Sequence, residues 1–137
     1  SYVDVGLINF SDRSIVYQKL THDKKRLIKM INSWEINGGG IGFCNEGEPF
    51  TDAKREIGSL QKDAKYLVVL TDGYWDRESL AIMRAKELHK MGIEVVAVGF
   101  GGAKKSFLNA IASRSDFSSF TDIGNLESTL TGIAKIL

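Results

Sequence analysis

The chain has 137 residues, of which 43% are hydrophobic and 26% are charged, and this fits one compact soluble domain. The chain has eighteen basic and seventeen acidic side chains, so it lacks the excess of positive charge that is typical of proteins that bind nucleic acid or an anionic membrane surface. No apolar run approaches the length of a membrane span. Cys44 is the single cysteine, which excludes an intrachain disulfide and weakly favours a reducing, cytoplasmic setting.

Strands and helices alternate along the sequence. Apolar runs and turn residues predict strands at residues 3–10, 14–19, 66–71, 93–98 and 118–121. Helical spacing of apolar residues predicts helices at residues 23–34, 51–60, 76–91, around 107–112, and from 125 to the last residues. This order predicts an α/β fold with a doubly wound, mostly parallel sheet and one antiparallel edge hairpin formed by the first two strands.

The ends of the predicted helices have recognisable signals. Thr21 or Asp23 is expected to cap the first helix, Thr51 the second and Asp76 the third, while Gly92 ends the third. The runs at 66–71 and 93–98 are continuously apolar, which is typical of parallel strands that are covered on both faces.

One carboxylate, that of Asp72, directly follows a buried strand in the run Val68-Val69-Leu70-Thr71-Asp72-Gly73. Ligands in open α/β sheets bind at the carboxyl ends of the strands. Asp72 is therefore a candidate ion ligand or phosphoacceptor, although Asp-Gly after a strand is also common turn chemistry. Tyr74 and Trp75 follow at once, and two large aromatics in a loop either pack locally or anchor a partner.

Five segments, in the correct order, resemble the von Willebrand factor A domain. Residues 5–12 resemble the family's second strand, and the glycines at 38–40 resemble a loop that normally reads Gly-Gly-Thr. Residues 70–73 resemble the fourth-strand signature, residues 93–101 the next strand with its Gly-x-Gly exit, and residues 107–112 the helix after it. The resemblance covers the whole chain and implies a single domain over residues 1–137.

The chain departs from that family at its metal site. The family begins with a central strand that ends in Asp-x-Ser-x-Ser, and the nearest string here, residues 12–16, keeps two of those three residues. Gly40 or Ile41 stands in place of the loop threonine. A hard ion such as Mg²⁺ needs about six oxygen ligands. The resemblance therefore implies an incomplete metal-ion-dependent adhesion site with Asp72 as a weak ligand, and it implies Mg²⁺ or another divalent cation only if upstream residues supply the missing ligands.

The absent first strand would lie between the strands at 3–10 and 66–71. We expect that strand to lie upstream of a truncated chain, although another chain can supply it, or the two flanking strands can close up and pair directly. An unfilled gap would leave backbone groups unpaired, which is costly when they are buried.

These features predict a non-catalytic module that binds another protein, with no role for nucleic acid or membrane. By resemblance, the partner approaches the edge where Asp12, Ile41, Asp72, Tyr74 and Trp75 gather. One alternative is a receiver-like domain that is phosphorylated on Asp72 with Lys104 nearby, although the acidic pair of such domains is absent from the sequence. The other alternative is a scaffold segment whose sheet is completed by a second chain.

Overall fold

Strands β1 (Val5–Phe10) and β2 (Ser14–Thr21) form an antiparallel hairpin in the computed structural model, which describes residues 3–11, 13–34 and 48–137. The hairpin pairs Phe10 with Ser14 beside the turn, and irregular pairing lies between Val5 and Ile8. The hairpin was predicted, but β1 starts two residues later than expected and β2 ends two residues later.

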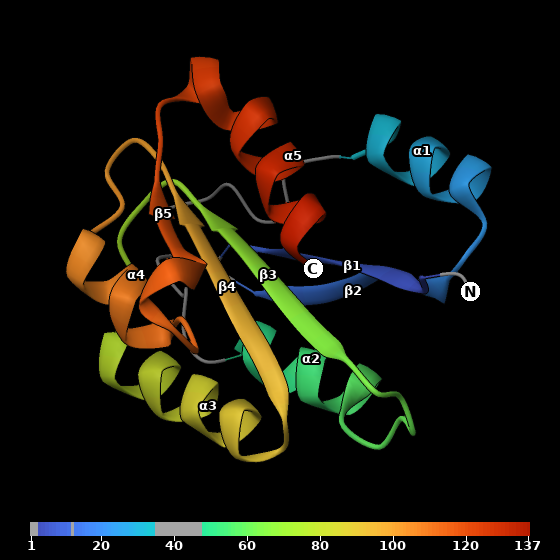
Figure 1. The fold of residues 1–137 in the computed structure, drawn as a ribbon, viewed down its shortest axis with the longest axis horizontal. Coiled ribbons are helices and arrows are strands. Elements are labelled where there is room, and N and C mark those ends of the chain that lie inside the picture. Colours follow the sequence, from blue (N-terminus) through green and yellow to red (C-terminus); the bar gives the residue numbers. More distant parts are fainter. Residues whose placement is uncertain (1–2, 12, 35–47) are drawn as a thin grey trace.

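A second sheet contains three parallel strands in the order β3 (Lys65–Thr71), β4 (Ile93–Gly99) and β5 (Ser118–Phe120). Lys65 pairs with Ile93, and the register continues without a shift to Thr71 and Gly99. Short 3-10 helices at Ser115–Phe117 and Ile123–Asn125 flank β5. The predicted α/β class, with parallel strands and one antiparallel hairpin, is confirmed (Figure 1).

Within the described residues, five α-helices connect or follow these strands. Their bounds are α1 Lys24–Asn32, α2 Glu48–Ile57, α3 Glu78–Lys90, α4 Lys105–Ile111 and α5 Leu126–Ile136. Asp23 caps α1 as predicted, since its side chain accepts a hydrogen bond from the backbone N–H of Arg26 at 3.1 Å. Gly92, with φ +72°, follows α3 as the predicted stop.

Two helix starts differ from the prediction. Helix α2 already includes Glu48, so Thr51 is not its N-cap. Pro49 is compatible with its place in the first turn, because the backbone N–H groups of that turn have no hydrogen-bond partner within the helix. Helix α3 begins at Glu78 with Arg77 as N-cap, so Asp76 does not cap it. Local cap signals place such boundaries only to within a few residues.

The two faces of the parallel sheet are covered by different helices. A methyl group added to Gly99 would clash with Leu108 of α4, so the odd-numbered residues of β4 face the layer that α4 shares with α3. The even-numbered residues Val96 and Val98 face the other layer, and both are buried. Helix α5 belongs to that second layer and contributes Ile133 to the core (Figure 1).

Strand β3 is not covered on both faces, which corrects the expectation from its apolar sequence. Val69 and Thr71 are buried, but Val68 and Leu70 are 40% and 38% exposed. Their in-register neighbours on β4, Val96 and Val98, are 2% and 0% exposed. The covering layer therefore protects β4 on this face and ends before β3.

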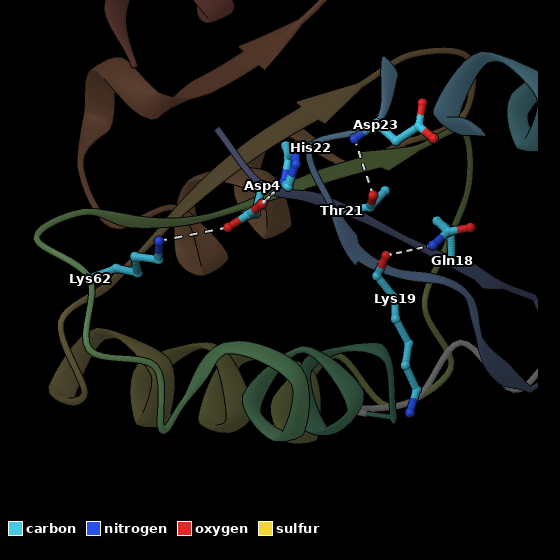
Figure 2. Close-up of polar contacts among 7 residues, drawn as sticks. All are labelled: Asp4, Gln18, Lys19, Thr21, His22, Asp23 and Lys62. Carbon is cyan, nitrogen blue, oxygen red and sulfur yellow. Dashed lines mark hydrogen bonds and ion pairs between the residues drawn. The ribbon is translucent and has the colours of Figure 1, made fainter. Parts of the chain in front are cut away.

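The two sheets are separate, and side chains join them at both ends. Asp4, just before β1, lies 3.7 Å from the ammonium of Lys62, just before β3, and it also contacts His22 at 3.3 Å (Figure 2). At the other end, the rings of Phe10 and Trp75 lie 5.2 Å apart. Among the described residues β1 and β3 share no ladder, so the alternative in which these flanking strands close up and pair directly is not found in this structure.

Candidate functional site

Three parallel strands end at one edge of the sheet, at Thr71, Gly99 and Phe120. The loops that follow these strands therefore lie side by side, and the candidate site is built from them. Asp12 and Ile41, together with the glycines at 38–40, lie outside the described residues, so their positions relative to this edge stay predictions.

Backbone hydrogen bonds hold the loop of Asp72 against the next loop. The carbonyl of Thr71 accepts from the N–H of Phe100 at 3.1 Å, and the carbonyl of Asp72 accepts from the N–H of Gly102 at 2.9 Å. Gly101 has φ +58°, and a side chain on it would approach the Asp72 carbonyl to 3.2 Å. The exposed Asp72 therefore sits on a fixed backbone at the strand end.

Trp75 packs into the core beneath this edge. Its side chain is 4% exposed, and its ring lies 5.2 Å from Phe10, 5.7 Å from Phe50 and 5.2 Å from Phe107. The indole N–H donates to the hydroxyl of Thr71 at 3.3 Å. The prediction of Trp75 as a surface anchor is therefore corrected, because three phenylalanines from separate elements enclose its ring.

Tyr74 has the opposite orientation and is 66% exposed. The ammonium of Lys104 lies 5.2 Å from the centre of its ring, within the range of a cation–π contact. Lys104 also pairs with Glu78 at 2.8 Å. The hydrogen bond and the negative charge of Glu78 raise the pKa of the Lys104 ammonium, so this cation is held at the edge.

A second lysine and ring extend the same edge. The ammonium of Lys105 lies 5.1 Å from the ring of Phe120, which is 41% exposed at the end of β5. We call Tyr74, Lys104, Lys105 and Phe120 the aromatic–lysine strip. Sequence reasoning missed Lys105 and Phe120 as site residues, although Lys105 begins the helix after β4 and Phe120 ends β5, and those positions were a usable signal.

By resemblance, a divalent cation is expected at this edge only if upstream residues supply the missing ligands. Among the described residues, no group of three histidine, cysteine, aspartate or glutamate side chains is arranged to hold a metal. Glu78, at the start of α3, is engaged by Lys104. Asp72 therefore stays a single candidate ligand in this part of the chain.

The receiver-like alternative gains no support from Lys104. That hypothesis requires the lysine to contact the acceptor Asp72, whereas Lys104 pairs with Glu78 and lies over Tyr74.

A wide-open depression of about 550 Å³ lies elsewhere, at the C-terminal part of α2 beside Met91. Its lining, which includes Lys54 and Arg55, contains no set of groups for catalysis.

Comparison with known proteins gives one family. A model of the von Willebrand factor type A domain matches residues 2–132. No match was found among curated proteins. None of the described helices is both long enough and apolar enough to cross a membrane.

Several solved structures share the fold. Proximal thread matrix protein 1 from the mussel byssus is 25% identical with a TM-score of 0.82, over 97% of this chain and 34% of that chain. The same mussel protein, in a structure with a zinc-occupied MIDAS motif, is 23% identical with a TM-score of 0.78, over 96% of this chain and 34% of that chain. The von Willebrand factor domain of the type V pili tip protein Mfa5 from Porphyromonas gingivalis is 9% identical with a TM-score of 0.85, over 97% of this chain and 79% of that chain. The chain thus spans 34% of the length of the mussel protein.

Proposed function

Because the chain belongs to the von Willebrand factor type A domain family, a family of protein-interaction and adhesion modules, we propose that it is a non-catalytic module that binds another protein at the strand-end edge. The partner contacts Asp72 and Tyr74 and, by resemblance to the family, also Asp12 and Ile41. Trp75 supports this surface from below and does not contact the partner.

The exposed ring of Tyr74 is the observation that carries this proposal. A tyrosine that is 66% exposed on a fixed loop offers a large contact area at little cost in side-chain entropy. Lys104 over the same ring supplies a positive charge that a partner carboxylate can approach. The aromatic–lysine strip thus supports binding of a protein segment that carries acidic side chains.

The metal-ion-dependent adhesion site is, in this proposal, incomplete. Asp72 is its weak candidate ligand, and a hard divalent cation needs more oxygen ligands than one carboxylate supplies. The mussel protein has a zinc-occupied MIDAS motif, whereas we propose that Lys104 and Lys105 provide the positive charge at this edge.

Site-specific photo-crosslinking in the organism that produces the protein tests the proposal. A benzophenone amino acid replaces Tyr74 in one variant and Met91 in a control, because Met91 is 37% exposed at the opposite edge of the sheet. We expect a partner protein to crosslink from position 74 and not from position 91. Equal crosslinking from both positions, or none from position 74, would contradict the proposal.

A second candidate function is a scaffold segment whose sheet is completed by another polypeptide. The lack of a ladder between β1 and β3 in the described part of the chain favours it. Light scattering after gel filtration tests it, since strands with open edges promote association. We expect the isolated chain to self-associate, and a stable monomer would argue against this candidate.

A further inference from the structure

We propose that the strand-end edge recognises a segment of another protein that carries a basic and an acidic side chain about 10 Å apart. The basic side chain of the partner pairs with Asp72, and its carboxylate pairs with Lys105. The apolar residues between these two charges lie against the rings of Tyr74 and Phe120. This inference rests on the proposed function, and it names the chemistry of the partner at that same edge.

The pairing of charges at the edge is the first argument. The Glu78 carboxylate lies 2.8 Å from the Lys104 ammonium and raises its pKa, so the charge of this lysine is offset within the chain. Asp72 and Lys105 are both exposed, and neither forms an ion pair within residues 3–11, 13–34 and 48–137. Of the two lysines in the aromatic–lysine strip, Lys105 is therefore the one that takes the partner's carboxylate.

The register of the sheet sets the distance between these two charges. Thr71 pairs with Gly99, and Gly99 pairs with Phe120, so the ends of β3 and β5 lie in line across the sheet. Two strand spacings separate them, which is roughly 10 Å. Asp72 directly follows Thr71, and the Lys105 ammonium lies 5.1 Å from the centre of the Phe120 ring. A negative and a positive charge therefore mark the two sides of the edge.

Aromatic surface is exposed between the two charges. Tyr74 is 66% exposed and Phe120 is 41% exposed. A methyl group added to Gly102 would lie 3.6 Å from the Asp72 carbonyl and 3.9 Å from the Tyr74 ring, so that ring stands beside the Asp72 loop. Lys104 lies 5.2 Å from the ring centre and positions the ring. The rings supply contact area, and the two charges fix the direction of the bound segment.

The distance between the charges defines their spacing in the partner sequence. In the polyproline II conformation, residues i and i+3 lie on the same face and are about 9 Å apart. A cation and a carboxylate with two residues between them therefore match Asp72 and Lys105. The intervening residues are apolar, because they cover aromatic rings.

A set of three peptides, followed by NMR chemical-shift titration, tests this assignment. The parent probe is acetyl-Glu-Pro-Pro-Lys-Pro-Pro-Glu-amide, in which the lysine has a glutamate three residues away on each side, so that either chain direction fits. The second peptide has glutamine in place of the lysine, and the third has glutamine in place of both glutamates. We expect the parent probe to shift the amide signals of Gly73, Tyr74 and Phe120 with saturation.

Two charge-removing variants identify which protein group meets which peptide charge. Asp72→Asn should weaken binding of the parent and third peptides roughly two- to fivefold and leave the second unchanged, because only the second lacks the cation. Lys105→Gln should weaken binding of the parent and second peptides by a similar factor and leave the third unchanged. Asp76→Asn and Lys135→Gln remove exposed charges of the same signs and should change none of these affinities. Equal effects of a variant and its control would overturn the inference.

A charge-neutral double variant tests the role of the other lysine. Glu78→Gln combined with Lys104→Gln removes both members of one ion pair and leaves the net charge unchanged. We expect it to change the affinity of the parent probe less than Lys105→Gln does. A larger loss than that of Lys105→Gln would overturn the assignment of the carboxylate to Lys105.

Photo-crosslinking from position 74 separates this inference from the function on which it rests. A partner that crosslinks there, while the peptides leave the edge signals unshifted or bind without dependence on their charges, would overturn this inference and leave the proposed function standing. Absence of both crosslinking and peptide binding would overturn both. Crosslinking together with the charge-specific pattern of peptide binding would support both.

Discussion

The indole of Trp75 contacts phenylalanine rings from β1, α2 and α4, and it therefore joins the hairpin to the helical layer. We expect Trp75→Ala to lower the free energy of unfolding by about 3–5 kcal/mol, because a large cavity forms where Phe10, Phe50 and Phe107 meet. Tyr74→Ala is the matched control, since that ring is 66% exposed, and its effect should stay within about 0.5 kcal/mol. Urea denaturation measures both values, and similar losses would contradict the placement of the two rings.

Because Lys104 pairs with Glu78 in the folded protein, the pKa of the Lys104 ammonium depends on folding. Glu78 raises the pKa of the Lys104 ammonium in the folded protein. A raised lysine pKa stabilises the fold fully below the unfolded value of about 10.4, and this stabilisation is lost as the pH rises through the folded pKa.

We expect Glu78→Gln to lower the pKa of Lys104 toward its ordinary value, as followed by an NMR pH titration of the Lys104 side chain. Glu127→Gln removes an exposed carboxylate on α5 and should leave that titration unchanged. A Lys104 titration that does not respond to Glu78→Gln would show that the 2.8 Å pair does not persist in solution.

At the scale of elements, α1 depends on its cap more than the other helices do, because none of its residues is buried. Its support comes from the Asp23 cap and from contacts to β2, including the Tyr17 hydroxyl that donates to the Ser33 carbonyl at 2.7 Å. We expect Asp23→Ala to cost about 1 kcal/mol of local helix stability.

Hydrogen exchange in α1 measures that loss, and the rates in α3 should not change, because α3 is anchored by buried Ala81, Ala85 and Leu88. Asp63→Ala, at an exposed position before β3, serves as the control. Equal effects of the two substitutions on α1 would contradict the capping role of Asp23.

The sequence predicted the order and type of these elements because their signals are local. Apolar spacing identified α3 and α5, and the turn glycine at 92 identified a helix end. The start of α2 was missed because Pro49 is compatible with either a helix start or the residue before one. Exposure of Val68 and Leu70 was not predictable, because it depends on how far the covering layer extends over the sheet.

The candidate site was predictable only in part, for a similar reason. Asp72 at a strand end follows from the pattern of apolar residues alone. Tyr74 is exposed and Trp75 is buried because aromatic rings from distant segments enclose only Trp75, and no local sequence pattern reveals that packing. The strip formed with Lys105 and Phe120 arises from the pairing of β5 with β4, and only the folded sheet brings these residues to one edge.

At the scale of the whole molecule, side chains at the two ends of the sheets hold them together. The chain has the fold of the von Willebrand factor type A domain, and the edge where its parallel strands end is exposed. We propose that the strand-end edge of this molecule binds a protein partner through Tyr74 and the lysines.

We propose that the strand-end edge binds its partner without a stably bound metal, and an Mn²⁺ titration followed by NMR tests this proposal. A paramagnetic ion held by Asp72 would broaden the amide signals of Gly73, Tyr74 and Gly101 selectively and with saturation. We expect millimolar Mn²⁺ to broaden these signals no more than those beside Glu127, an exposed carboxylate on α5. Saturable broadening confined to the Asp72 loop, and abolished by Asp72→Asn, would contradict it.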